Sequence, residues 1–352
     1  MRPELLAALA LAAASSQALE IVFNDIGVAQ GYTALSPQAL AGFEAAASLW
    51  EALLADPVTV RINVATYNFG AGSSNIIGQA SSVFYEGSYS ELRDAWIGDA
   101  TSTTDLAVLS RLPAGPTYTR RINRTSDLTD PATPVLATTD GMYINGANAK
   151  ALGLLSGDFS AVDATIEFNS AFAFDYDRSN GISAGQMDFI GVAAHEIGHA
   201  LGFVSVVDFI DGGSIPTDFA WHMPMDFLRY SQTSLALGVT DTSIDDQARF
   251  LALGNLGILV STGVNFGDGQ QASHFLDNVG LGMMDPTAGN GELRLFTGYD
   301  LVIFDALGWD LTPEALSLAS EAMAAIPEPS TYGLAVGALG LAWAVRRRRR
   351  VN

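Results

Sequence analysis

The chain of 352 residues contains no cysteine. This absence excludes a disulfide framework, a cysteine–histidine nucleophile and any latency mechanism in which a cysteine blocks a metal. The stability of the folded protein must therefore come from its core, and 49% of the residues are hydrophobic.

Positive charge is scarce as well. Positions 19–330 hold 37 of the 38 acidic residues but only 11 of the 17 basic ones, and Lys150 is the single lysine. The formal net charge of this stretch is −26. Such an acidic surface disfavours nucleic acids and anionic lipids as partners, and it favours solubility outside the cell.

Only four histidines occur, and two of them share a short motif. Residues 195–203 read HEIGHALGF. On a helix, His195 and His199 project from the same face one turn apart, which suits two imidazoles that bind one zinc ion. Glu196 can reach a water on the open side of the metal as general base, and Gly202 permits a sharp turn after the helix. The motif predicts a zinc hydrolase; the alternative is a buried helix that carries two histidines by chance.

A catalytic zinc site needs a third protein ligand. Ser205 stands where the most frequent spacing of this motif would place a histidine, and serine is a poor zinc ligand. The other candidates are His274, Asp208, His222 and Glu292. His222 has no matching context, and we expect it at the surface or in a lid.

The segment from His274 onward resembles the end of a metzincin site. His274 is followed by Gly-Leu-Gly-Met-Met-Asp-Pro at 280–286. Together with the helix motif, a distant histidine before a methionine-containing turn is similar to the leishmanolysin-like metzincin proteases. The resemblance implies that His274 is the third ligand and that Met284 is the Met-turn residue beneath the metal, with Met283 as second choice. Asp208 stays the alternative third ligand.

The resemblance also implies a fold and an activity. The fold would be α+β and metzincin-like, with a twisted sheet and helices, including the zinc helix, in an upper lobe at about 19–203. A mostly irregular and helical lower lobe would follow at about 204–311. One catalytic Zn²⁺ would activate water, and Glu196 would pass its proton to the leaving amine of a protein or peptide substrate. The chain departs from leishmanolysins in lacking their disulfides. Glu292 would be the third zinc ligand if the protein were a gluzincin, but the Met turn argues against that class.

Hydrophobic periodicity places the main elements. We expect strands at 20–23, 58–67 and 164–174, and a helix at 37–54 that begins at the N-cap Ser36. By resemblance, the strand at 164–174 would be the edge strand above the cleft and would pair with an extended substrate.

Further elements are expected between and after these strands. Residues 68–130 are expected to form a long excursion with a helix near 89–98. A closing helix is expected at 298–309. The inserted region contains a group of large apolar residues that form either a substrate pocket or a small satellite core: Trp221, Met223, Met225, Phe227 and Tyr230.

Two features flank the zinc helix on its N-terminal side. Asp188 is expected to cap that helix. The turn at 175–181 carries Asp175 and Asp177, whose oxygens can bind Ca²⁺; a plain turn is the alternative, since no downstream bidentate glutamate follows.

Residues 1–18 predict a secretory signal peptide. They combine Arg2, an apolar run and a small-x-small cleavage site at 16–18. The protein is therefore expected to be exported across the inner membrane with the help of a signal peptidase.

The opposite end resembles the PEP-CTERM sorting signal of Gram-negative bacteria. Pro-Glu-Pro at 327–329 precedes an apolar stretch at 331–345 and five arginines at 346–350. The whole signal covers 327–352, after a spacer at 312–326. The resemblance implies transient inner-membrane anchoring by a short transmembrane segment, removal by an exosortase, and display at the surface, in the extracellular matrix or in secreted form. A permanent membrane anchor is the alternative.

Overall fold

The computed structural model of the protein describes residues 18–123, 134–215 and 220–324. Residues 1–17 of the predicted signal peptide and the whole predicted sorting signal at 327–352 lie outside the described residues. Within the described ranges, no helix is both long and apolar enough to cross a membrane. The fold is a mixed α+β fold with several small sheets.

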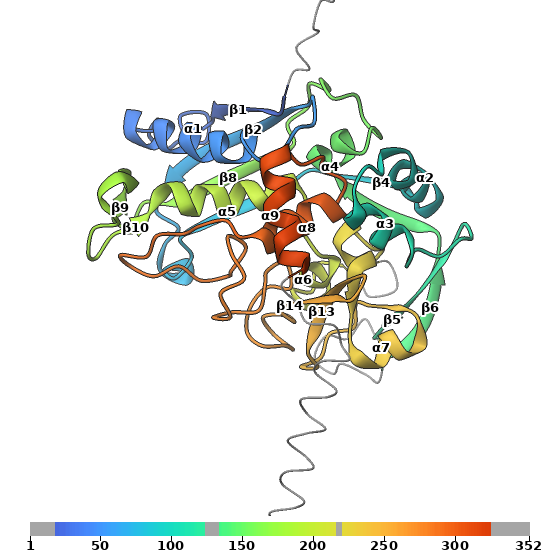
Figure 1. Cartoon of the computed structure of the whole chain (residues 1–352). Coiled ribbons are helices and arrows are strands. Elements are labelled where there is room, and N and C mark those ends of the chain that lie inside the picture. The colour runs from blue at the N-terminus through green and yellow to red at the C-terminus, as the bar shows by residue number, and fades with distance from the viewer. Residues whose placement is uncertain (1–17, 124–133, 216–219, 325–352) are drawn as a thin grey trace, which may run out of the picture.

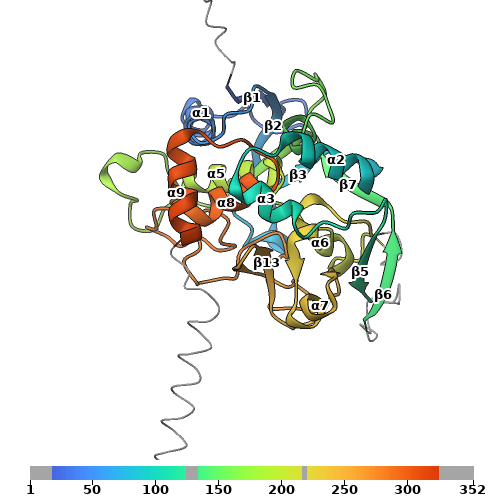
Figure 2. The ribbon, with the colours of Figure 1, turned by 45° about the vertical axis from the view of Figure 1, so that its right-hand side comes forward.

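The upper part of the molecule contains a four-stranded sheet with the order β1-β2-β8-β3 (β1, β2 and β8 are labelled in Figure 1, and β3 in Figure 2). β1 (Glu20–Asp25), β2 (Thr59–Tyr67) and β8 (Ala164–Asn169) run parallel, and β3 (Gly78–Ser82) is antiparallel to β8. The strands predicted at 20–23 and 58–67 are therefore confirmed.

The strand predicted at 164–174 differs in two ways. It ends at Asn169, and β9 (Phe174–Asp175) is a separate short strand paired with β10 (Met187–Asp188). The prediction that it forms the edge was wrong, because β3 lies outside β8 and forms that edge. The sequence of β3, Gly-Gln-Ala-Ser-Ser, has no alternation of large apolar residues, so its signal was too weak to separate it from the expected excursion.

Two long helices, α1 (Pro37–Glu51) and α5 (Phe189–Leu201), pack on each other and on the sheet. Ser36 caps α1 as predicted, and the helix ends three residues before the expected position. The two helices approach closely at Gly42, where a Cβ atom would lie 2.4 Å from the Phe189 ring. Figure 1 shows α5 crossing the middle of the molecule, between β1 and β2 above and β13 and β14 below.

The single lysine lies inside the fold, where the strands β2 and β8 of this sheet begin. Lys150 is 2% exposed, and its Nζ donates to Asp163 Oδ2 at 2.6 Å and to the Thr59 carbonyl at 2.8 Å. Asp163 also accepts a hydrogen bond from the Arg61 backbone N–H. The buried charge is therefore paired and hydrogen-bonded, as burial of an ammonium group requires.

The region between β3 and α5 is a mixture of short helices and hairpins. α2 (Tyr89–Asp99) and α3 (Thr103–Leu109) begin with capping boxes at Ser88 and Ser102, so the helix predicted near 89–98 is confirmed. β4 pairs with β7, and β5 pairs with β6. The bounds of the other elements are η1 (Ala71–Ser73), β4 (Phe84–Ser88), β5 (Tyr118–Ile122), β6 (Val135–Thr139), β7 (Gly141–Asn145), α4 (Gly146–Ala151) and η2 (Arg178–Asn180).

The lower part contains more strand than the sequence predicted. A three-stranded antiparallel sheet has the order β11-β13-β14, and β12 adds to β5. Most of the described residues of this part are irregular or helical, as expected, and the apolar runs RFLAL and LGILV add a hairpin that the sequence analysis did not predict. The elements are α6 (Val206–Asp211), η4 (Pro224–Leu228), β11 (Arg229–Tyr230), α7 (Gln232–Leu237), β12 (Thr240–Asp241), β13 (Arg249–Leu253) and β14 (Leu256–Val260).

The apolar group of the inserted region forms core and does not line the cleft. Met223, Met225, Phe227 and Tyr230 are at most 5% exposed, and none of them lines the cleft described below. Trp221 packs against Gly141, where a Cβ atom would lie 2.4 Å from the indole ring. Met225 and Phe227 belong to the main core and Met223 to a smaller cluster with Val206 and Ile210, so neither a substrate pocket nor a separate satellite core describes the whole group.

Two helices close the described chain. α8 (Gly298–Ala306) occupies the closing helix predicted at 298–309, and Gly308 adopts a φ of 94° just after it. α9 (Pro313–Ala324) then packs along α8 through Ala315 and Ala319. Figure 2 shows the two helices side by side, with α3 next to α8.

Candidate metal centre

The helix α5 that carries the motif is fixed at both ends. At its start, Asp188 accepts a hydrogen bond from the Gly191 N–H at 2.9 Å and so caps the helix as predicted. At its end, Gly202 adopts a φ of 124°, which only glycine adopts without strain. Asn145 Nδ2 donates to the Ala200 carbonyl at 2.7 Å, and Trp309 Nε1 donates to the Leu201 carbonyl at 2.9 Å.

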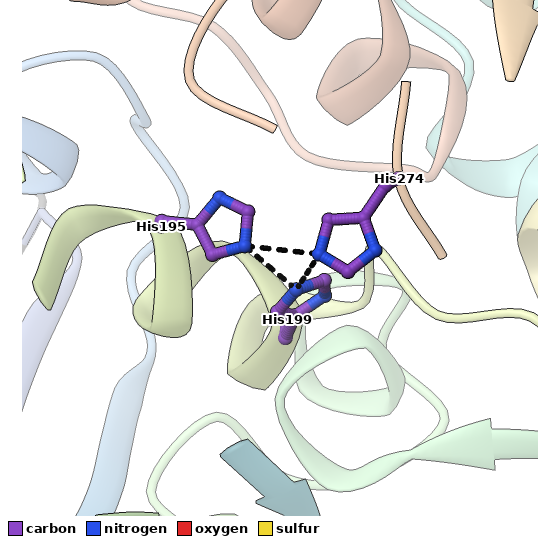
Figure 3. A group of neighbouring side chains, drawn as sticks. All are labelled: His195, His199 and His274. Carbon is purple, nitrogen blue, oxygen red and sulfur yellow. Dashed lines mark hydrogen bonds between the residues drawn. The ribbon is translucent and has the colours of Figure 1, made fainter. Parts of the chain in front are cut away.

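Three histidines converge next to this helix (Figure 3). His195 and His199 come from consecutive turns of α5, and His274 comes from the loop after β14. Their Nε2 atoms are 3.1, 3.1 and 3.2 Å apart. The structure thus brings together the two motif histidines and the third ligand that the family resemblance implies.

The opposite nitrogen of each ring faces a backbone carbonyl. The Nδ1–H groups of His195, His199 and His274 donate to the carbonyls of Met283, Phe203 and Gln271 at 2.8, 2.8 and 3.2 Å. A neutral imidazole carries one proton, so this arrangement leaves a lone pair on each Nε2 atom. Three converging lone pairs repel one another unless a cation lies between them.

The protonation state of the rings also suits a metal. Burial lowers the pKa of His199 to about 4 and holds the pKa of His195 and His274 well below the usual range. Metal binding requires neutral imidazoles, and the buried rings are neutral at neutral pH. Each carbonyl partner fixes the tautomer and orientation of its ring, as the outer partners of metal-bound histidines do.

The spacing fits a first-row metal ion. Zn–N bonds of about 2.0–2.1 Å with tetrahedral angles place ligand nitrogens about 3.4 Å apart, close to the distances observed. A set of three histidines with a fourth position open is typical of catalytic zinc, although imidazole also suits copper, iron and nickel. The buried group can therefore hold a metal ion, and the geometry does not by itself select zinc.

Glu196 lies beside the three histidines in the same cleft. It is 6% exposed, and its Oε1 lies 3.0 Å from the place where a Cβ atom of Gly78 would stand. Burial raises the pKa of Glu196 to about 8, and the positive charge of Arg294 opposes this shift. A cation at the histidines would favour the carboxylate in the same way, because opposite charges stabilise the charged form.

The cleft has a volume of about 710 Å³ and is lined by residues of both the upper and the lower part of the molecule. Every residue of the edge strand β3 lines it, together with α5, the middle of α6 and the loops around His274 and Pro286. A free strand edge therefore runs along the wall of the cleft next to Glu196.

The methionine pair takes two different positions. Met284 packs against α5, since a Cβ atom on Gly198 would lie 2.5 Å from its sulfur. Met283 supplies the carbonyl that accepts from His195. Asp300 holds both residues by accepting their backbone N–H groups at 3.0 and 3.2 Å. Met284 is thus the residue that lies against the helix between the motif histidines.

Asp208, the alternative third ligand, is not part of the histidine group. Its carboxylate accepts the backbone N–H groups of Ala272 and Ser273 and the Ser273 hydroxyl. Burial raises the pKa of Asp208 to about 6, although the hydrogen bonds from Ser273 oppose this shift. Asp208 therefore fixes the loop that presents His274.

The remaining two candidates also lie outside the group. Glu292 accepts the Gly289 N–H at 2.7 Å within its own turn. The expectation that His222 lies at the surface or in a lid was wrong, because this residue is 0% exposed. Its Nε2 pairs with Thr240 Oγ1 at 2.7 Å, and its ring packs on Tyr118. A β-bridge from His222 to Met142 brings the segment into the core.

The turn at 175–181 shows hydrogen bonds to its own backbone. Asp175 accepts the N–H groups of Asp177 and Ser183, and Asp177 accepts the N–H of Ser179. Hydrogen bonds hold the pKa of both carboxyls below the usual range. In the described part of the chain, the three histidines form the one group of three or more side chains suited to a metal ion, and the turn does not form another.

Two residues of the centre were missed at the sequence level. Asp300 carries a local signal, because Thr297 and Asp300 form a capping box at the start of α8, but nothing nearby indicates its contact with Met283 and Met284. Arg294 is 6% exposed and lines the cleft, and no sequence pattern indicates its partners.

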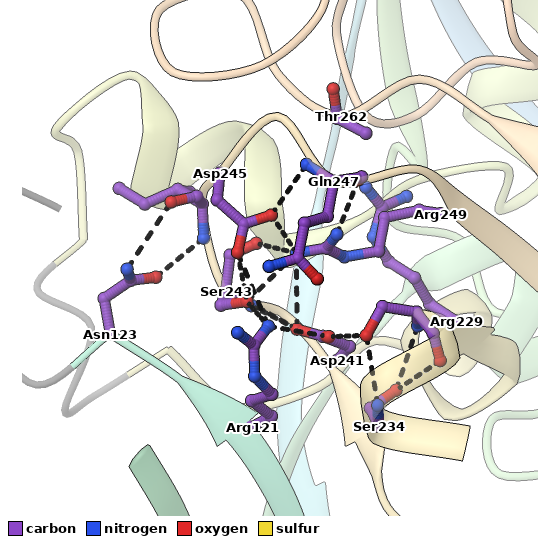
Figure 4. A network of polar contacts seen from close by, with 12 residues as sticks. Arg121, Asn123, Arg229, Ser234, Asp241, Ser243, Asp245, Gln247, Arg249 and Thr262 are labelled. Atoms are coloured by element: carbon purple, nitrogen blue, oxygen red, sulfur yellow. Dashed lines mark hydrogen bonds and ion pairs between the residues drawn. The ribbon is translucent and has the colours of Figure 1, made fainter. Parts of the chain in front are cut away.

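A second polar cluster lies in the lower part of the molecule (Figure 4). Asp241 pairs with Arg121 at 3.0 Å and with Arg249 at 3.5 Å, and Asp245 pairs with Arg249 at 2.7 Å. Ser243 joins these groups by hydrogen bonds. The charges of this cluster compensate one another, so we assign it a structural role.

Comparison with known proteins gives no relative for the chain: no family model, no curated protein and no solved structure matches it.

Proposed function

We propose that the protein is a zinc-dependent endopeptidase with a metzincin-like fold. The observation that carries the proposal is the convergence of three Nε2 lone pairs beside Glu196 in a cleft walled by a free strand edge. The distant position of His274 before Met284 supports the leishmanolysin-like assignment over other zinc hydrolases.

The strand edge supports a peptide substrate. An extended peptide can add to β3 as a further strand, with its backbone hydrogen bonds giving affinity and its side chains fitting the cleft. Such pairing would place a peptide bond beside Glu196, since β3 passes next to that carboxylate at Gly78. A saccharide polymer has no backbone that would pair in this way.

The chain's own residues divide the chemistry among them. The bound metal would supply Lewis acidity toward water and toward the carbonyl oxygen of the peptide bond. Glu196 would take the proton of the attacking water on a carboxylate oxygen and deliver it to the leaving amide nitrogen. The carbonyls of Met283, Phe203 and Gln271 hold the three rings in the tautomer that binds metal.

Casein hydrolysis by the zinc-loaded protein and its Glu196→Gln variant tests the proposal. We expect wild-type cleavage to stop with a chelator, and the variant to bind zinc but turn over about 10²–10⁴-fold more slowly. Glu292→Gln is the matched control, because Glu292 lies outside the histidine group, and it should keep wild-type activity.

Two results would contradict the proposal. Equal activity of the wild type and Glu196→Gln would remove the role of Glu196. A wild type that binds one zinc ion and cleaves no protein substrate would indicate a scaffold of zincin type at the cell surface or in the matrix.

The proposed setting is outside the cytoplasm. The signal-peptide pattern at 1–18 and the PEP-CTERM resemblance at 327–352 support export across the inner membrane and sorting by an exosortase. The acidic composition of the chain between them agrees with a soluble extracellular catalytic domain. Mass spectrometry of the protein from its source cells would show whether both segments are removed.

A further inference from the structure

Arg294 is a buried cation at the centre of the Met turn. Its Nη2 donates to the Met283 carbonyl at 2.7 Å and to the Asp285 carbonyl at 2.6 Å, and its Nη1 donates to the Thr287 carbonyl. In the described part of the chain, no carboxylate lies within ion-pair distance of it. A guanidinium buried among backbone carbonyls fixes the path of that backbone, because its donors form a rigid fork.

One of these carbonyls is shared with a metal ligand. The Met283 oxygen accepts from Arg294 Nη2 at 2.7 Å and from His195 Nδ1 at 2.8 Å. The two nitrogens are 3.2 Å apart, as expected for two donors that meet at one oxygen. The carbonyl that selects the tautomer of His195 is thus held in place by Arg294.

The backbone of Arg294 is anchored at the start of the zinc helix. Its N–H donates to Asp188 Oδ2 at 3.1 Å, and Arg178 donates to its carbonyl. Asp188 is also the cap of α5 and pairs with Arg178 at 3.1 Å. Gly191 permits this approach, because a Cβ atom there would lie 2.8 Å from the Cβ of Arg294. Arg294 therefore connects the first turn of α5 to the Met turn.

We propose that Arg294 is a positioning residue of the metal centre, which acts on His195 through the Met283 carbonyl. It orients the Met turn so that the His195 Nδ1–H has its acceptor and the Nε2 lone pair points at the metal. A lysine would keep the charge but would lack the planar fork that reaches three carbonyls at once. The inference rests on the metal-binding part of the proposed function and is independent of peptide cleavage.

The test uses the full chain loaded with Co²⁺, whose visible spectrum reports the geometry of its ligands. We expect Arg294→Gln to shift this spectrum and to release the metal to a chelator about 10–100-fold faster than wild type, because loss of a residue that orients metal ligands typically lowers metal affinity by about that factor. The spectrum and the release rate of Arg294→Lys should lie between those of the wild type and those of Arg294→Gln. Guanidinium ion at non-denaturing concentration should restore slow release in Arg294→Ala.

Arg93→Gln is the matched control. Arg93 also donates to two backbone carbonyls, those of Ala114 and Gly115, but it belongs to α2 and lies outside the cleft. This variant should keep the wild-type spectrum and release rate.

Three results would overturn the inference: a wild-type cobalt spectrum and release rate in Arg294→Gln, an equal change in Arg93→Gln, or no rescue of Arg294→Ala by guanidinium while its circular dichroism is native. If Arg294→Gln fails to fold, Arg294→Lys serves as the test variant. A wild-type spectrum and release rate in Arg294→Lys would count against the role of the guanidinium fork. None of these readouts depends on casein hydrolysis, so a failure here differs from a failure of the proposed activity.

Discussion

His195 and His199 stand on one helix, whereas His274 comes from a loop 75 residues after His199. On the helix side, which we define as these two residues of α5, the backbone repeat itself sets the spacing of the ligands. On the loop side, defined as residues 271–286, three side chains hold the backbone: the half-buried Asp208 and the buried Asp300 and Arg294. The candidate metal centre is therefore held by helix geometry on one side and by side-chain contacts on the other.

This difference predicts where single substitutions act. A helix keeps its geometry through many hydrogen bonds along its own length, so one changed side chain seldom moves it. The loop side depends on a few carboxylate and guanidinium contacts with backbone groups, and the loss of one leaves buried polar groups without a partner. We expect the loop side to be the first to loosen.

Removal of the metal should give the largest contrast. We expect amide hydrogen exchange at 271–286 to rise by about tenfold or more after chelation, while α5 keeps its protection, because the loop loses the bond through His274. Hydrogen–deuterium exchange with mass spectrometry would measure both segments in one sample. Equal loss of protection in both segments would remove the distinction between the two sides.

Asp208→Asn should weaken the hold on the loop side and leave the helix side unchanged. Asp208 holds the backbone next to His274, so we expect zinc affinity to fall by about 10–100-fold with little change in the helix. Asp211→Asn is the control, because Asp211 lies one turn further along α6 and holds Asn265 and Phe266 instead. Competition with a chromogenic chelator would measure both affinities, and equal losses in the two variants would contradict the assignment.

Gly198→Ala should disturb the contact between the two sides. The new methyl group would lie 2.5 Å from the Met284 sulfur, and we expect a loss of about 1–3 kcal/mol in the free energy of unfolding. Gly98→Ala in α2 meets no atom within 4 Å and should instead stabilise the protein by about 0.4–1 kcal/mol. Urea unfolding of both variants checks the sign, and a stabilised Gly198→Ala would show that Met284 yields freely.

The smallest effect on the metal centre is expected for a substitution far from it. Asp56 is 3% exposed, and burial together with the negative charge of Asp310 raises its pKa from 3.8 to about 8. The folded protein therefore keeps a proton that the unfolded chain releases, and stability falls as pH rises from about 4 to 8, by at most about 1.4 kcal/mol per pH unit.

Asp56→Asn should remove this part of the pH dependence without any change in metal affinity. Urea midpoints at several pH values, compared with wild type, measure it. A variant with the wild-type slope would show that Asp56 does not contribute.

The sequence predicted the helix side well and the loop side only through a family resemblance. The spacing of His195 and His199, the cap Asp188 and the turn at Gly202 all lie within fifteen residues, so local periodicity is enough to place them. The position of His274 depends on a fold that joins β14 to α5, and no local rule connects them. Arg294 acts on backbone carbonyls, which carry no sequence signal at all.

The errors have the same cause. β3 was missed because an edge strand with one polar side tolerates Gly, Ala and Ser, and its pairing with β8 spans more than eighty residues. His222 was placed at the surface because its neighbours, Trp221 and Met223, match no pattern of a metal site, and nothing local indicates the bridge that buries it. Both depend on contacts between segments distant in the chain.

The pairing of Lys150 with Asp163 has a practical consequence. The chain has one lysine and no cysteine, and the lysine is 2% exposed. Acylating reagents that modify side-chain amines will react with Lys150 only when the contact between α4 and the sheet opens. The rate at which Lys150 is labelled in the unmodified protein therefore measures how often the contact between α4 and the sheet opens.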